Sequence, residues 1–128
     1  MTDSRCPCMG SSLDRLLRPV VMAVLAGQAD GLHGYRIAQR LAEAALFSRR
    51  PPDNTGLYRV LKAMEEEGYL TSAWDVEGSG PAKRIYVLTE TGQDCLERWV
   101  ETLDAYCRDL RQTISFIKHR ARQPVRGR

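Results

Sequence analysis

Apolar residues in the last third of the chain recur every seven positions, and a second series fills the intervals. The two series consist of Leu96, Leu103, Leu110 and Ile117, and of Val100, Cys107 and Ile114. These are the a and d positions of a helix that packs against another helix. We therefore predict a long helix from Thr89 to about His119. Three heptads leave more apolar surface than the chain itself can cover, which predicts a homodimer.

The whole chain is too short for several domains. It has 128 residues, of which 43% are hydrophobic and 27% charged, as in one small globular domain, and this excludes a multidomain enzyme. The longest apolar run, Val20–Ala26, is shorter than the roughly 20 residues of a membrane span. The first five residues lack the apolar region of a signal peptide. We expect a cytoplasmic protein that does not associate with membranes.

Three helices are predicted before the long one. Apolar residues at helical spacing predict a first helix, mainly from about Pro19, which ends in the glycine-rich turn 27–34. A second helix follows, with one face formed by Tyr35, Ile37, Ala38, Leu41, Ala42 and Ala45. Pro51 and Pro52 interrupt the helical pattern, and Asp53 or Asn54 suits the start of a third helix. The inward stripe of that third helix consists of Leu57, Val60, Leu61 and Met64.

Two strand-like segments, 69–74 and 85–88, flank the turn-rich stretch 77–81 and predict a hairpin. The fold class is therefore mainly α with a small β-wing: a winged helix-turn-helix plus a long C-terminal dimerisation helix. We divide the chain into a flexible N-terminal tail (1–12), a winged helix-turn-helix DNA-binding domain (13–88), the dimerisation helix (89–119) and a basic tail (120–128).

The distribution of charge locates the candidate DNA contacts. The net charge is +3, but residues 118–128 alone carry five basic side chains and no acid, so the preceding residues have a net charge of −2. DNA would therefore meet local basic patches. One patch is the outward face of the third helix, which offers Asn54, Thr55, Arg59 and Lys62 to base edges or phosphates. The alternative is an ordinary solvated basic face.

The wing and the aromatic residues allow two interpretations each. Lys83 and Arg84 flank the hairpin, where they could meet the DNA backbone or keep an edge strand soluble. Tyr58 could contact a phosphate or pack against the second helix. His33 has no suitably placed nucleophile for a catalytic triad, and we expect a structural role.

Several short motifs, taken in order, resemble the PadR family of bacterial transcriptional regulators. They are His33-Gly34-Tyr35-Arg36-Ile37, Leu57-Tyr58, Leu61-Lys62, Glu65-Glu66-Glu67-Gly68, Gly80-Pro81, Tyr86, Leu88-Thr89-Glu90 and Gly92. They cover roughly residues 20–95. The resemblance implies a winged-helix dimer that binds an operator, usually as a repressor, and is released by a small ligand. Tyr35 and Arg36 join the candidate DNA contacts.

The chain departs from the family at two places. It has Thr55-Gly56 where the family commonly has Gly-Thr, and Arg59 where a proline commonly follows the tyrosine. The operator sequence therefore cannot be transferred from the family. In some short members a tryptophan on the last helix stacks flat ligands, and that position is Leu103 here, with Trp99 one turn earlier. The candidate ligand residues are Trp99, Leu103 and Tyr106.

The four cysteines support a different hypothesis. Cys6 and Cys8 are one residue apart, without a second Cys/His pair at the spacing of a structural zinc site. No cofactor is expected, but a metal-, haem- or redox-sensing interaction module that uses Cys6 and Cys8 is the alternative function. Cys107 could oxidise across the dimer or simply fill its interface. A thiol enzyme is the third hypothesis, and it lacks a base near any cysteine.

These patterns together predict a homodimeric regulator without enzymatic activity. Its two third helices would enter successive major grooves about 34 Å apart, so the operator would be pseudo-palindromic with half-sites about one helical turn apart. Arg59 is the first candidate for reading base sequence, because an arginine can bond a guanine through two hydrogen bonds.

Overall fold

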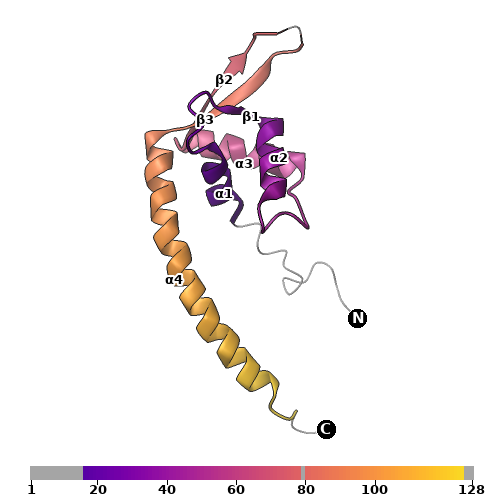
Figure 1. Cartoon of the computed structure of the whole chain (residues 1–128), viewed down its shortest axis with the longest axis vertical. Helices are drawn as coiled ribbons and strands as arrows, with labels where there is room; N and C mark the ends of the chain where they lie inside the picture. Colours follow the sequence, from indigo (N-terminus) through magenta and orange to yellow (C-terminus); the bar gives the residue numbers. More distant parts are fainter. Residues whose placement is uncertain (1–15, 79, 126–128) are drawn as a thin grey trace. The chain divides into compact units, whose positions relative to one another are not determined.

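The computed structural model describes residues 16–78 and 80–125 of the chain (Figure 1). The elements, in order, are α1 (Leu17–Leu25), β1 (Leu32–His33), α2 (Gly34–Glu43), α3 (Asn54–Glu66), β2 (Leu70–Asp75), β3 (Lys83–Leu88) and α4 (Glu90–Ala121). The predicted class, mainly helical with a small β-wing, is confirmed. The chain forms two compact units, one up to Leu96 and one from Glu97 onwards, so that α4 belongs to both.

The core of the first unit lies between the three short helices and the base of the sheet. Its buried apolar side chains are Leu17, Val21, Met22, Leu25, Ile37, Leu41, Phe47, Leu57, Leu61, Met64, Leu70 and Tyr86. The helices contribute at spacings of three and four residues, as an amphipathic helix requires. Phe47 comes from the segment between α2 and α3, which has no regular apolar period. A complete small core therefore forms within this unit.

Two helices differ from the sequence-based prediction. Helix α1 begins at Leu17, so Pro19 lies in its first turn, where a backbone N–H has no helical partner and proline is tolerated. Helix α2 ends at Glu43, which leaves Ala45 outside it. Of the residues predicted to form one face of α2, Ile37 and Leu41 are buried, whereas Tyr35 is 51% exposed.

An ion pair joins α1 to the residue that follows α3. Arg18 donates two hydrogen bonds to the Glu67 carboxylate, from Nη1 to Oε2 at 2.6 Å and from Nη2 to Oε1 at 3.1 Å. The bond from Arg18 lowers the pKa of Glu67, and the same bond raises the pKa of Arg18. The acidic run at the end of α3 is thus partly neutralised by the first helix.

Among the described residues the sheet has three antiparallel strands in the order β1-β3-β2, whereas the sequence predicted two. Strand β1 pairs Leu32 with Tyr86 and His33 with Ile85. The preceding Gly31 has a φ of +78°, and a Cβ there would lie 2.6 Å from the backbone oxygen of Tyr86. Glycine is therefore required for the chain to run this close to β3. The third strand ties the start of α2 to the wing.

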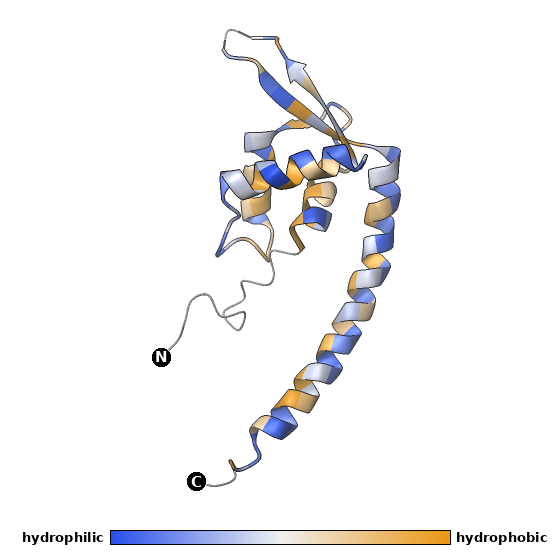
Figure 2. Cartoon of the chain, turned by 180° about the vertical axis from the view of Figure 1, so that it is seen from behind, coloured by the Kyte–Doolittle hydropathy of each residue, from blue (hydrophilic) through white to orange (hydrophobic). Residues whose placement is uncertain are grey.

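Helix α4 begins after Thr89, whose Oγ1 accepts a hydrogen bond from Gly92 N–H at 3.0 Å and donates one to the Gly68 carbonyl at 2.7 Å. The predicted helix start is thus confirmed as an N-cap. The helix continues to Ala121, two residues beyond the predicted His119. Hydrophobic and hydrophilic residues are interspersed along its whole length (Figure 2). In the described part of the chain, no helix has the length and apolar character that crossing a membrane requires.

The predicted N-terminal tail, with Cys6 and Cys8, lies outside the described residues, as do Arg126 and Arg128 of the basic tail.

Candidate nucleic-acid interface

Helix α3 separates its residues into a buried stripe and an exposed polar face. Leu57, Leu61 and Met64 are buried. The exposed side chains, by contrast, are polar or charged: Asn54, Thr55, Tyr58, Arg59 and Lys62, followed by the acidic Glu66 at the end of the helix. Asp53 caps the helix by accepting a hydrogen bond from Gly56 N–H at 2.6 Å. The five predicted DNA contacts of α3 therefore lie on one exposed helix face, mostly in its first two turns.

Tyr58 packs against the start of α2 and is also partly exposed, and its contact with a phosphate stays a prediction. A Cβ placed on Gly34 would lie 2.5 Å from Cε1 of Tyr58, so the ring packs directly across the first residue of α2. The same side chain is 45% exposed. Gly34 permits this close approach between α2 and α3, and the ring keeps an exposed surface beside Arg59 and Lys62.

The root of the wing is fastened to the start of α2. His33 Nε2 donates a hydrogen bond to Asp75 Oδ2 at 3.0 Å, which joins β1 to β2. This bond, together with a weaker one from Glu77 N–H, lowers the pKa of Asp75. The His33 ring also stacks on Tyr35 with centroids 5.7 Å apart, and Lys83 Nζ lies 5.1 Å above the Tyr35 ring. His33 thus has a structural role, as predicted from the sequence, and the structure shows that it links the wing to the start of α2.

Arg84 belongs to a second network, on the side of the wing that faces α3. Its Nε donates to Ser72 Oγ at 2.8 Å, and Ser72 in turn donates to Glu65 Oε2 at 2.6 Å. Arg84 Nη2 lies 3.9 Å from the same Glu65 oxygen, and the guanidinium lies 4.9 Å from the centre of the Trp74 ring. Arg84 therefore contacts three neighbours, whereas Lys83 lies over the Tyr35 ring and pairs with Asp75 across β2 and β3.

A groove separates the outer part of α3 from β3. It has a volume of about 580 Å³ and is lined by Tyr58, Lys62, Glu65, Glu66, Arg84 and Tyr86. Burial raises the pKa of Tyr86 on its inner wall. A smaller hollow of about 260 Å³ lies over the start of α2 and is lined by His33, Gly34, Tyr35, Tyr58, Lys83 and Arg84. Tyr58 of α3 and Arg84 of the wing line both hollows, which therefore adjoin each other between α3 and the wing.

The remaining candidate DNA contact, Arg36, is exposed on α2, where its Nη1 donates to Gln39 Oε1 at 3.1 Å. With Tyr35 it extends the polar surface along the start of α2.

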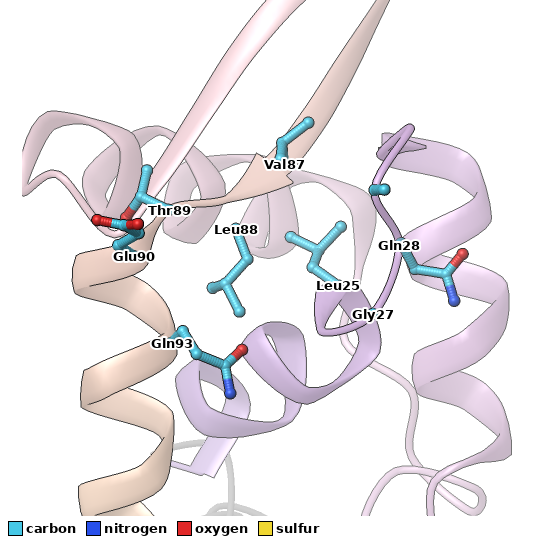
Figure 3. A pocket seen from close by; sticks show the side chains of 9 residues that line it. Leu25, Gly27, Gln28, Val87, Leu88, Thr89, Glu90 and Gln93 are labelled. Atoms are coloured by element: carbon cyan, nitrogen blue, oxygen red, sulfur yellow. The ribbon is translucent and has the colours of Figure 1, made fainter.

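A different hollow, of about 280 Å³, lies on another part of the first unit (Figure 3). It is lined by Leu25, Gly27, Gln28, Ala29, Val87, Leu88, Thr89, Glu90 and Gln93. Its polar side chains are Gln28, Glu90 and Gln93, which are exposed, and Thr89, which caps α4. This hollow contains no arginine or lysine and none of the residues predicted to bind DNA or ligand.

The predicted interface residues of α4 are largely uncovered. Val100 is 58%, Leu110 41%, Ile114 50% and Ile117 55% exposed. Cys107 is also exposed, whereas Leu96 and Leu103 are half-buried. Of the candidate ligand residues, Tyr106 is exposed and Trp99 is half-buried.

The described residues hold no candidate metal centre. Within 16–78 and 80–125, no three or more histidine, cysteine or acidic side chains gather as a metal would require. Cys95 and Cys107 are both free thiols.

A helix-turn-helix whose exposed helix stands beside a β-hairpin defines the class of winged-helix DNA-binding domains. The sequence matches the transcriptional regulator PadR-like family over residues 21–98. The chain therefore belongs to the PadR-like family of transcriptional regulators, which confirms the resemblance noted in the sequence. The family is one of regulators rather than enzymes. Among curated proteins, none matches the chain.

Solved structures agree with this assignment. The chain is similar to a PadR family regulator from Eggerthella lenta, with 25% identity and a TM-score of 0.64, over 83% of this chain and 92% of that one. It is also similar to Bacillus subtilis PadR in complex with operator DNA, with 26% identity and a TM-score of 0.57, over 67% of this chain and 46% of that one. A PadR family regulator from Clostridium difficile has the same fold, with 22% identity, a TM-score of 0.66, and coverage of 77% and 98%.

Sequence reasoning missed several residues of this surface. The residues that it missed make contacts between strands, or between a strand and α3, and these contacts depend on strand register. They are Glu65, Ser72, Trp74 and Asp75. The alternation of apolar and polar residues in β2 and β3 indicated that the two strands pair. It did not determine which residues lie opposite each other.

Proposed function

We propose that this protein is a homodimeric transcriptional repressor that binds a pseudo-palindromic DNA operator and has no enzymatic activity. The observation that carries the proposal is the exposed basic face of α3, which stands beside the wing in a member of a regulator family. The related Bacillus subtilis PadR is a protein bound to operator DNA. DNA binding by this chain is the simplest use of the same arrangement.

Each candidate contact takes a role from its chemistry. Arg59 reads a base edge in the major groove, with Asn54 and Thr55 beside it at the first turn of α3. Lys62, Arg36 and the hydroxyls of Tyr35 and Tyr58 meet phosphates, which position the protein without selecting sequence. Lys83 and Arg84 bring the wing to the flanking backbone. Of these two residues, Arg84 contributes less direct contact with DNA, because its guanidinium already contacts Ser72 and Glu65.

The second copy of the chain covers the apolar face of α4. The proposed interface residues are Leu96, Val100, Leu103, Cys107, Leu110, Ile114 and Ile117. Their heptad spacing and the exposure of most of them support this assignment. Two subunits would place two α3 helices on one face of the duplex and would exclude other proteins from that DNA, as repression requires.

A small flat ligand is the proposed effector. Trp99, Leu103 and Tyr106 follow one another at spacings of four and three, so they lie along one side of α4. A ligand stacked there would act on the same helix that pairs the subunits, and would release DNA by changing their spacing.

The decisive experiment is a footprinting titration on the DNA upstream of the protein's own gene, at two salt concentrations, against random duplex of equal length. Symmetric protection at protein concentrations at least about a hundredfold below those needed for random duplex would support the proposal. Equal and steeply salt-dependent binding to both duplexes would show that the protein binds DNA only through non-specific charge attraction. Absence of binding would favour the alternative sensor that uses Cys6 and Cys8, which a measurement of bound metal or haem would then test.

A further inference from the structure

The largest exposed aromatic side chain of the described wing is that of Trp74. Trp74 lies on β2, one residue before the end of the strand, and is 60% exposed. Most tryptophans bury their large apolar surface, so one left open on a small domain indicates a contact with another molecule. Trp74 was not among the candidate DNA contacts.

The Trp74 ring is held in place. Trp74 and Arg84 are direct partners across β2 and β3, and the Arg84 guanidinium lies 4.9 Å from the centre of the ring. Arg84 is itself fixed by Ser72 Oγ at 2.8 Å and lies near the Glu65 carboxylate. A cation over an aromatic face is a favourable contact at exposed sites. The orientation of the exposed indole ring is therefore fixed by its neighbours.

The register of the hairpin places this surface beside the groove next to α3. Residues two apart on a strand share a face of the sheet, and so do direct partners. Trp74 and Arg84 thus lie on the same face as Ser72 and Tyr86. Tyr86 and Arg84 line the groove together with Tyr58, Lys62, Glu65 and Glu66 of α3. The indole continues the wall of that groove toward the tip of the wing.

The charge of the wing indicates what kind of contact this surface makes. Between residues 70 and 88 the two acids, Asp75 and Glu77, balance the two bases, Lys83 and Arg84. Net Coulomb attraction between this segment and a polyanion is therefore small. An aromatic face needs no net charge to pack on the apolar side of a sugar or a base.

We propose that Trp74 is a DNA-contact residue of the wing, packing its indole on the deoxyribose of the strand that borders the α3 groove. Arg84 is its positioning residue, since it orients the ring through Ser72 and Glu65. The inference rests on the proposed function, because it assumes that α3 faces a DNA duplex. It adds a contact that does not depend on charge and does not select sequence.

The first test uses tryptophan fluorescence of the full chain and of Trp74→Phe, each titrated with the upstream DNA and with random duplex at low salt. The chain has two tryptophans, so the difference between the two titrations is the signal of Trp74. We expect emission from Trp74 to be quenched in proportion to complex formation, which labelled-DNA anisotropy measures independently. Unchanged Trp74 emission at saturating DNA would overturn the inference.

The second test is affinity. Trp74→Ala should weaken binding to both duplexes by about fivefold with an unchanged salt slope, and Trp74→Phe should restore most of the loss. Lys83→Ala should instead reduce the salt slope by about one unit, as loss of a phosphate contact does. Val76→Ala is the matched control, because Val76 is a 76% exposed apolar residue of the same hairpin, and it should bind like the native chain.

The outcomes separate the two proposals. Native affinity of Trp74→Ala would overturn the Trp74 contact and leave the regulator proposal intact. Quenching of Trp74 by raised protein concentration without DNA would identify a protein contact and overturn it as well. Failure of the native chain to bind either duplex at low salt would contradict the proposed function, and the Trp74 contact with it.

Discussion

The unit up to Leu96 buries its regularly spaced apolar residues, whereas the helix beyond it leaves most of its own exposed. In the first unit, Leu41, Leu61 and Met64 have no measurable exposure. Along α4, Val100, Ile114 and Ile117 have half or more of their surface exposed. Both regions have regular apolar spacing, so the sequence pattern alone does not distinguish them. The difference is that, among the described residues, the side chains of the first pattern are buried by the rest of their unit, whereas those of the second are exposed.

This contrast explains how the molecule divides its tasks. A region that completes its own core can hold a rigid exposed surface, here α3 and the wing. A helix whose apolar face is uncovered requires a partner, and in a homodimer that partner is a second copy of the same face. Four predictions test this division, ordered from the largest expected effect to the smallest.

The first prediction concerns the core. Leu61→Ala should lower the free energy of unfolding by about 2–5 kcal/mol, because it removes buried methyl groups and leaves a cavity. Leu46→Ala removes the same atoms from a side chain that is 41% exposed and should have a clearly smaller effect. Urea denaturation of both variants at equal protein concentration measures the difference, and equal losses would contradict the assignment of the core.

The second prediction concerns the helix. Ile114→Glu should weaken dimerisation by about a hundredfold or more, because it buries an unpaired charge at the interface. The monomer fold should remain, since Ile114 lies outside the first unit. Ser115→Glu adds the same charge at the neighbouring exposed position, off the heptad positions, and is the control. Sedimentation velocity over a range of concentrations measures both, and identical behaviour of the two variants would argue against the interface.

The third prediction concerns the exposed face of α3. Arg59→Ala should weaken operator binding by about 1–3 kcal/mol more than it weakens random-duplex binding, because only a base contact distinguishes the two. Lys62→Ala should reduce both affinities and lower the salt slope by about one unit. Arg49→Ala removes the same charge from the loop before α3 and serves as control. Equal losses on operator and random DNA would show that Arg59 reads no base.

The fourth prediction concerns the root of the wing. His33 lowers the pKa of Asp75 in the folded protein, so the pair stabilises the fold above the ordinary Asp pKa of 3.8, and this contribution disappears as pH falls through the lowered value. Asp75→Asn should therefore flatten the loss of stability between about pH 5 and pH 2. Urea unfolding at several pH values measures this slope, with Asp30→Asn as an exposed control. An unchanged slope would mean that the pair does not stabilise the fold.

The sequence predicted the parts of the fold that repeat. The apolar period of α3, the heptads of α4 and the Thr89 cap are local patterns, and the structure places them as expected. Strand β1 was missed because its two residues are too few to show alternation. Phe47 was missed in the core because it follows no period.

The candidate site shows the same limit. Arg59 and Lys62 could be placed on an exposed face from helical spacing alone. The link between His33 and Asp75 joins residues 42 positions apart, and the network of Arg84, Ser72 and Glu65 depends on strand register. Such contacts arise only when the chain closes its sheet, so no local pattern encodes them.

The central claim, that two copies of the α3 face read one duplex together, is tested most directly by changing the spacing of the operator half-sites. Once footprinting has located them, about five base pairs are inserted between the half-sites, which turns one half-site to the opposite face of the helix. If the two subunits bind together, affinity should fall to that for a duplex carrying a single half-site. Unchanged affinity after the insertion would contradict the claim, because a rigid dimer cannot reach both faces at once.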